Sequence, residues 1–96
     1  MSDHPKLLTP PHNFAIVQLP TRKFPGVVIQ GDTLHTMIAD IERIQSLLDD
    51  EDLDAAKDEL AFMKEGLSEA LQNFESACAL HSIALPYVRR AKEDEV

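Results

Sequence analysis

The stretch from Phe24 to His35, FPGVVIQGDTLH, has the residue types of a phosphate-binding corner. Apolar β-branched residues lead through Gly31 into a helical pattern, and the N-terminus of a helix attracts anions. A P-loop supplies several glycines and a lysine, whereas this corner has one glycine and no lysine. We therefore expect a structural corner, in which Gly31 takes a positive φ and Asp32 or Thr33 caps the helix. A small-ligand site made of these three residues is the weaker alternative.

An acidic run from Asp49 to Asp54 has some of the spacing of a calcium loop. Asp50, Asp52 and Asp54 match its positions one, three and five. Position six, which should be glycine, is Ala55, and position twelve, which should be a bidentate glutamate, is Ala61. We therefore expect no metal here, and interpret the run as acidic residues that favour the N-terminus of a following helix.

The remaining reactive side chains do not form a catalytic set. Cys78 is the only cysteine and adjoins an apolar stripe, which predicts a buried, inert thiol in a reducing, cytoplasmic compartment. In a straight helical hairpin His35 and His81 are roughly 20 Å apart, too far to share a metal. Thr36 and Ser82 neighbour these histidines, but adjacent helical residues point about 100° apart. We expect neither an enzyme nor a bound cofactor.

The composition sets further limits. Ninety-six residues make one domain, with 17 acidic and 9 basic residues and a net charge of −8. Adjacent basic residues occur only as two pairs, Arg22–Lys23 and Arg89–Arg90, so nucleic acid, which requires clustered cations, is not expected as a partner. No apolar run approaches the ~20 residues that span a bilayer, and the first 13 residues contain no apolar signal segment.

The chain divides into an arm, a folded part and a tail. Three prolines predict a disordered arm over residues 1–12. Residues 13–19 and 24–30 read as two strands of an antiparallel hairpin that turns at Pro20, and Pro25 places the second strand at an edge or a bulge. We expect a single α+β domain over residues 13–88 and a charged tail over residues 89–96.

Two amphipathic helices follow the strands. Apolar residues recur at three- and four-residue spacing from Leu34 to Leu48, and again from Leu53 to His81. The pattern predicts an antiparallel helical hairpin with a second helix of about 28 residues, roughly 18 Å longer than the first. We expect the β-hairpin to cover this overhang, with residues 83–88 packing back on it. The stripes favour an intramolecular core, and a second subunit in a four-helix arrangement is the alternative.

The segment LPTRKFPGVVIQGDTL resembles the signature of a family of small bacterial proteins of unknown function. That signature has the form LPxRxFPGhhhQGD[ST]L, followed by two helices and a C-terminal LPY, which is matched by residues 85–87. Thr21 and Lys23 depart from the glycine and arginine expected at their positions. The resemblance implies a fold with two helices after the signature, and it implies no activity, because the function of the family is unknown. The small size and acidity are also similar to those of immunity proteins of bacterial toxin systems.

The leading functional hypothesis is a small, acidic, cytoplasmic protein-binding module without enzymatic activity, of which an immunity-type inhibitor of a toxin is one form. The expected partner is a basic protein. The expected contact residues are Asp49, Asp50, Glu51, Asp52 and Asp54, with Arg22 and Lys23 at the hairpin tip. The alternatives are a homodimer through the second helix and a small-ligand binder at the Gly31–Asp32 corner.

Overall fold

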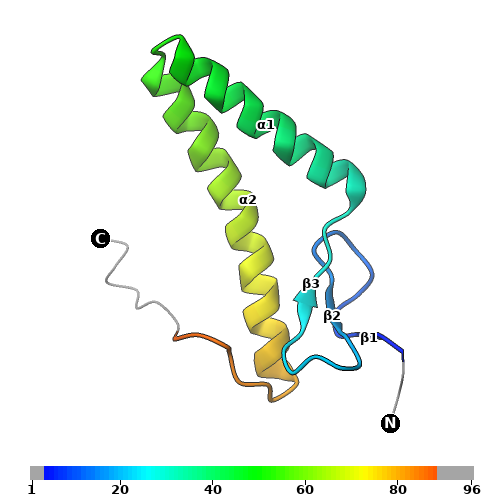
Figure 1. Cartoon of the computed structure of the whole chain (residues 1–96). Coiled ribbons are helices and arrows are strands. Elements are labelled where there is room, and N and C mark those ends of the chain that lie inside the picture. Colours follow the sequence, from blue (N-terminus) through cyan, green and yellow to red (C-terminus); the bar gives the residue numbers. More distant parts are fainter. Residues whose placement is uncertain (1–3, 89–96) are drawn as a thin grey trace.

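The computed structural model describes residues 4–88, which form a small antiparallel sheet and a long helical hairpin (Figure 1). This arrangement confirms the predicted α+β class. The elements are, in chain order, β1 (Lys6–Leu7), β2 (Ile16–Gln18), β3 (Gly26–Val27), α1 (Gly31–Asp49) and α2 (Leu53–Leu80).

The sheet has β2 at its centre, with β1 and β3 antiparallel to it on either side. The turn between β2 and β3 is closed by the Arg22 N–H, which donates to the Leu19 carbonyl at 3.3 Å and leaves Pro20 in the second position. β3 is an edge strand that starts directly after Pro25, so the missing N–H of that proline costs no ladder hydrogen bond. The predicted hairpin is therefore present, with shorter strands than expected.

The N-terminal arm differs from the disordered segment that its prolines predict. Lys6 and Leu7 pair with β2, and the buried Leu8 donates its N–H to the Ile16 carbonyl at 2.8 Å. The Thr9 hydroxyl accepts from the Ile16 N–H at 3.0 Å. Prolines are absent from residues 6–9 themselves, so nothing prevents this short segment from forming the third strand.

The two helices run antiparallel, and the ion pair between Arg43 Nε and Glu59 Oε1 at 3.0 Å joins them at one level. The 28 residues of α2 agree with the predicted length. α1 has 19 residues, beginning at Gly31, three residues before the apolar stripe starts. Gln30 is its N-cap residue and makes no side-chain cap hydrogen bond, so the expected cap by Asp32 or Thr33 is wrong. Gly31 is helical rather than in a positive-φ conformation, which is also a correction.

Both helices end in the same motif. After α1, Glu51 takes a φ of 59° while the Asp52 N–H donates to the Leu47 carbonyl at 2.8 Å. After α2, Ser82 takes a φ of 57° while the Ile83 N–H donates to the Cys78 carbonyl at 2.8 Å. These are Schellman motifs, in which the left-handed residue is usually glycine. Two non-glycine residues fill that position here.

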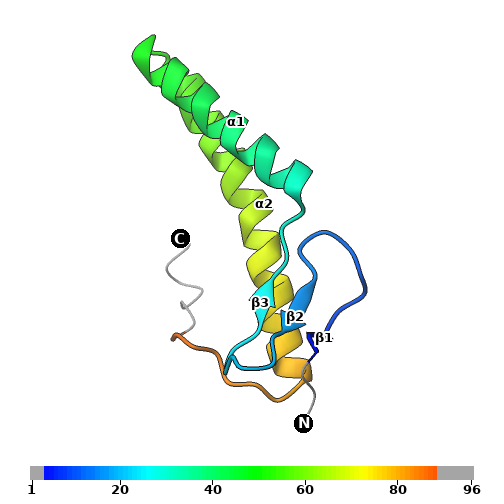
Figure 2. The same ribbon diagram turned by 45° about the vertical axis from the view of Figure 1, so that its right-hand side comes forward.

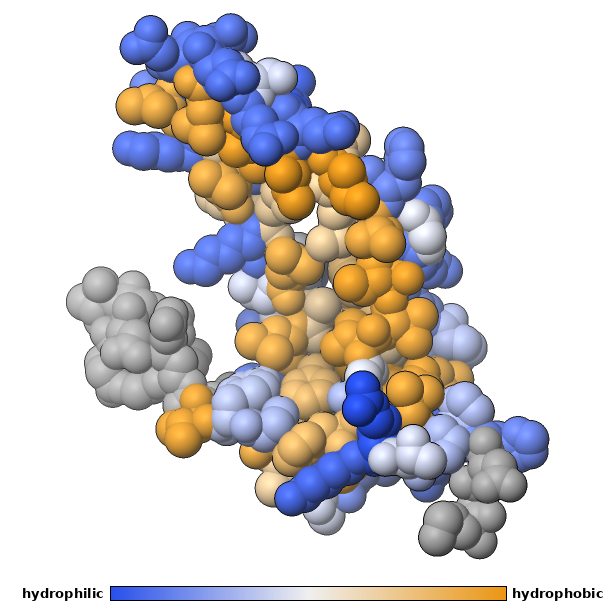
Figure 3. Space-filling view, in the orientation of Figure 1, coloured by the Kyte–Doolittle hydropathy of each residue, from blue (hydrophilic) through white to orange (hydrophobic). Residues whose placement is uncertain are grey.

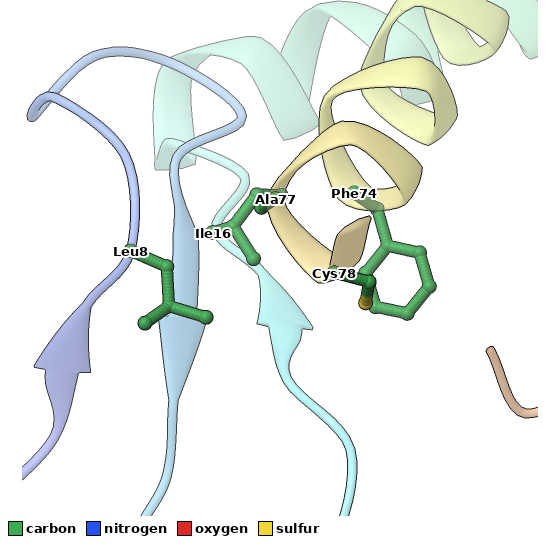
Figure 4. Close-up of a cluster of buried hydrophobic side chains, with 5 residues drawn as sticks. All are labelled: Leu8, Ile16, Phe74, Ala77 and Cys78. Atoms are coloured by element: carbon green, nitrogen blue, oxygen red, sulfur yellow. The ribbon is translucent and has the colours of Figure 1, made fainter. Parts of the chain in front are cut away.

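The hydrophobic core lies where the sheet packs against the C-terminal half of α2 (Figures 1 and 2). Side chains from the segment after β1, from β2 and from α2 meet in this cluster (Figure 4), namely Leu8, Ile16, Phe74, Ala77 and Cys78. Ile83 and Leu85 pack against it from the segment after α2. The prediction that the β-hairpin and residues 83–88 cover the overhang of the second helix is therefore confirmed for Phe74, Ala77 and Cys78, whereas Leu71 stays 48% exposed.

Candidate functional site

The Gln30–Thr33 corner is held together by its own polar groups. Asn13 Nδ2 donates to Thr33 Oγ1 at 2.9 Å, and Asn13 Oδ1 accepts from the Gln30 N–H at 3.4 Å. Asp32 Oδ1 accepts from the Thr33 N–H at 2.8 Å, and the Asp32 carbonyl accepts from Thr36 Oγ1 at 3.1 Å. The donors and acceptors that a ligand would need are engaged in attaching the start of α1 to the loop before β2.

A groove of about 170 Å³ lies beside this corner, between the start of α1 and the middle of α2. Thr33 is part of its lining, whereas Gly31 and Asp32 are not. Its volume is below the ~300 Å³ at which small-molecule sites begin. The geometry therefore gives little support to the small-ligand alternative.

The acidic run forms the tip of the helical hairpin. Asp52 is the N-cap of α2, and its Oδ1 accepts from the Ala55 N–H at 3.2 Å. Glu51 provides the left-handed residue that ends α1, and Asp54 lies in the first turn of α2. Asp49 and Asp50 are exposed at the end of α1. Capping accounts for much of this run. Within residues 4–88, no three side chains of the types His, Cys, Asp and Glu are placed so that they could hold a metal ion.

Arg22 and Lys23 lie in the connection between β2 and β3, at the opposite end of the molecule from the acidic tip (Figure 1). The Arg22 carbonyl accepts from Gln18 Nε2 at 2.6 Å, and Lys23 Nζ is 5.3 Å from the centroid of the Phe24 ring. The long axis of the molecule extends 54 Å. The two predicted contact regions therefore do not form one surface.

Cys78 is completely buried in the core cluster. Burial raises the pKa of its thiol, and the nearby Glu75 carboxylate raises it further. A thiol that stays protonated is a poor nucleophile. His81, which follows α2, approaches the Leu8 carbonyl with Nε2 at 3.4 Å and so links the end of the helix to the segment after β1.

The most extensive surface feature is an apolar face on one side of the helical hairpin (Figure 3). On each helix four aliphatic side chains follow one another along this side, with exposed fractions between 43% and 56%. We define the apolar face by these residues, which are Leu34, Ile38, Ile41 and Leu48 of α1 and Leu53, Leu60, Leu67 and Leu71 of α2. It is a continuous apolar surface that nothing in residues 4–88 covers.

The middle of the apolar face is a shallow groove of about 450 Å³ between the helices. Ile41 borders it from α1, and Leu60, Leu67 and Leu71 border it from α2. Met63, Lys64 and Ser68 complete its lining. The groove is thus lined mainly by apolar side chains, with one lysine and one serine from α2.

The opposite side of the helix seam has a different character. Arg43 precedes the buried Ile44 by one position, and Glu59 precedes Leu60 of the apolar face by one position. Each side chain is therefore turned about 100° away from that neighbour. Their ion pair at 3.0 Å spans the seam there.

Residues 2–87 of the chain match the model of a family of unknown function, DUF6959. The chain belongs to this family. The match covers all the elements of the DUF6959 fold described above, from β1 to the end of α2. No curated protein and no solved structure matches the chain.

In this DUF6959 chain no helix within residues 4–88 combines the length and the apolarity needed to cross a bilayer. The apolar periodicity of the sequence includes the residues of the apolar face but favours an intramolecular core for them. The width of the stripes could have indicated an uncovered surface. Ile38 and Leu71 lie outside the single row of apolar residues that one neighbouring helix can cover.

Proposed function

We propose that this chain is a cytoplasmic, non-enzymatic protein-binding module that docks through its apolar face. The observation that carries the proposal is the continuity of eight half-exposed aliphatic side chains across two helices. The largest apolar patch of a typical monomer covers about 300–600 Å² and often marks an interaction site. The expected partner surface is α-helical and apolar, because aliphatic ridges on helices pack into grooves like the one between α1 and α2.

Two further features support a binding role over a catalytic one. The polar side chains at the Gln30–Thr33 corner are used to attach α1 to the loop before β2. The thiol of Cys78 is buried and its pKa is raised. These polar and thiol groups thus have structural roles, whereas the surface that no part of residues 4–88 covers is apolar.

An immunity-type inhibitor is the second candidate. It rests on the exposed carboxylates at the tip of the helical hairpin, which include that of Asp50, the C-cap residue of α1. Such a cluster favours fast association with a basic protein. In this candidate the tip, and not the apolar face, contacts the partner.

The test is site-specific photo-crosslinking in the cells that naturally produce the protein. A photoreactive amino acid replaces Ser68, which borders the groove, or Glu69, which is exposed on the outer side of α2. Discrete adducts from position 68 and none from position 69 are expected. Equal adducts from both positions, or none from position 68 in the folded protein, overturn the proposal, and adducts from a probe at Asp50 alone favour the inhibitor.

A further inference from the structure

The apolar face has about the area of one side of a stable interface. The side chains of the apolar face expose roughly 700 Å², which is close to the ~800 Å² that each partner buries in a stable interface.

The apolar face is organised in layers. The Arg43–Glu59 ion pair fixes which residues of the antiparallel helices lie at one level. Counted from this level, three pairs of the apolar face match along the two helices and repeat every seven residues, although the helices diverge from the acidic tip toward the start of α1 (Figures 1 and 2): Leu34 with Leu67, Ile41 with Leu60, and Leu48 with Leu53. Heptad-spaced layers of four side chains form the core of four-helix bundles. Each layer here contains two side chains, so the face has the pattern of half a bundle.

Charged residues border the two long edges of the apolar face. On α2, Lys57 and Lys64 follow Leu53 and Leu60 by four residues and lie on the outer edge. On α1, Glu42 and Asp49 follow Ile41 and Leu48 by one residue and lie on the opposite outer edge. All four are exposed. One edge is basic, the other is acidic, and both have a seven-residue spacing.

We propose that the apolar face is occupied by a second copy of this chain, related by a two-fold axis parallel to the helices, so that the two hairpins form a four-helix bundle. This inference rests on the proposed protein-binding function. The axis places α1 of each copy over α2 of the other, which completes the layers of four and brings each basic edge to an acidic edge. Isologous contacts of this kind require a self-complementary surface.

The charges decide between the two symmetric ways of stacking the hairpins. An axis perpendicular to the helices would place α1 over α1 and α2 over α2, which would bring acidic edges together and basic edges together. With the parallel axis, Lys57 lies at the level of residue 45 of the second copy, about 5 Å along the helix from Glu42 and from Asp49. Opposite charges at that spacing lie within reach of a lysine side chain. They also offset part of the repulsion between two copies that each carry a charge of −8.

The first measurement is sedimentation equilibrium of the full chain over a range of concentrations. A mass of twice 10.7 kDa is expected. Two charge-reversed proteins, K57E/K64E and E42K/D49K, are expected to dimerise at least about tenfold more weakly, because each reversal turns attraction into repulsion at both edges. Circular dichroism checks that these exposed substitutions leave the helices intact.

Mixing the two charge-reversed proteins is the sharper test. In the mixed dimer both edges again pair opposite charges, so native mass spectrometry should show the mixed species in excess over either homodimer. The protein with all four reversals should recover the wild-type dissociation constant. Matched controls change the net charge equally away from the apolar face: K6E/K23E in the sheet region and E65K/E69K on the outer side of α2.

Each outcome bears on one proposal. A chain that stays monomeric at all concentrations overturns the proposal that a second copy occupies the apolar face. The protein-binding function then stands if a probe at Ser68 still yields adducts with another protein. A dimer that is unaffected by K57E/K64E, or controls that weaken it equally, overturns the parallel axis. A failure of both the mass measurement and the Ser68 probe removes the protein-binding function itself.

Discussion

Asn13 Nδ2 donates a hydrogen bond of 2.9 Å to Thr33 Oγ1, twenty residues further along the chain. The same side chain accepts from the Gln30 N–H, at 3.4 Å, immediately before α1. These contacts join the loop before β2 to the first turn of α1, which has no side-chain cap of its own. The direction in which α1 leaves the sheet, and with it one half of the apolar face, depends on this asparagine.

Replacing Asn13 with alanine should lower the free energy of unfolding by about 1–2 kcal/mol, since a partly buried hydroxyl and a helix-end N–H lose their partner. Thr33→Val should lower the free energy of unfolding by less, because the hydrogen bond between Asn13 Oδ1 and the Gln30 N–H remains. The two changes together should cost less than the sum of the single effects, which urea denaturation of the four proteins measures. Strict additivity would mean that the two side chains are not coupled.

Glu51 provides the second prediction, because its φ of 59° is a conformation that L-residues adopt at a cost. Glu51→Gly should raise the free energy of unfolding by about 1 kcal/mol, as glycine is the preferred residue at this place in a Schellman motif. Glu51→Ala is the matched control, since it removes the carboxylate and keeps the Cβ. Thermal unfolding of both proteins decides, and an equal gain in the alanine protein would assign the effect to charge instead of conformation.

The helices could be predicted from the sequence because their apolar periodicity is long and unbroken. The start of α2 at Leu53, its length of 28 residues and the coverage of its C-terminal half by the sheet all followed from that pattern. The ends were harder to predict. Glu51 and Ser82 terminate helices without glycine, and Gln30 stands at the N-cap without a capping side chain.

The third strand and the apolar face could not be obtained from local pattern alone. Lys6 and Leu7 have no strand signal between Pro5 and Pro10, and they pair only because β2 offers a free edge. Periodicity shows which side of a helix is apolar, but not whether the neighbour that covers it belongs to the same chain. Ile44 and Leu48 fit one stripe, yet the first is buried at 6% exposure and the second is 48% exposed.

Cys78 gives a prediction for pH dependence. Burial raises the pKa of its thiol above the ordinary range, so above the pKa of a free cysteine, about 8.5, the unfolded chain loses its proton first. Folding stability from this group is complete below that pH and is lost as pH rises toward the folded pKa. Between pH 8 and pH 10 the free energy of unfolding should therefore fall more steeply in the wild type than in Cys78→Ala, as measured by urea denaturation. Parallel slopes would show that the thiolate is tolerated in the folded core.

The last prediction separates the core from the apolar surface with two phenylalanines of the same helix. Phe74 is 6% exposed, belongs to the buried cluster and stacks on Tyr87 with ring centroids 6.4 Å apart. Phe62 is 72% exposed. Phe74→Ala should cost about 3–5 kcal/mol, enough to unfold a chain of this size at moderate temperature, whereas Phe62→Ala should change stability by less than about 0.5 kcal/mol.

Circular dichroism and urea denaturation of both proteins provide the comparison. Phe74→Leu keeps most of the buried volume and should lie between wild type and Phe74→Ala, which tests whether packing is the cause. A large loss in Phe62→Ala would place that ring in a contact between copies, and the loss should then grow as the protein is concentrated. A small loss in Phe74→Ala would contradict the core, because residues 4–88 contain no other buried aromatic side chain to replace it.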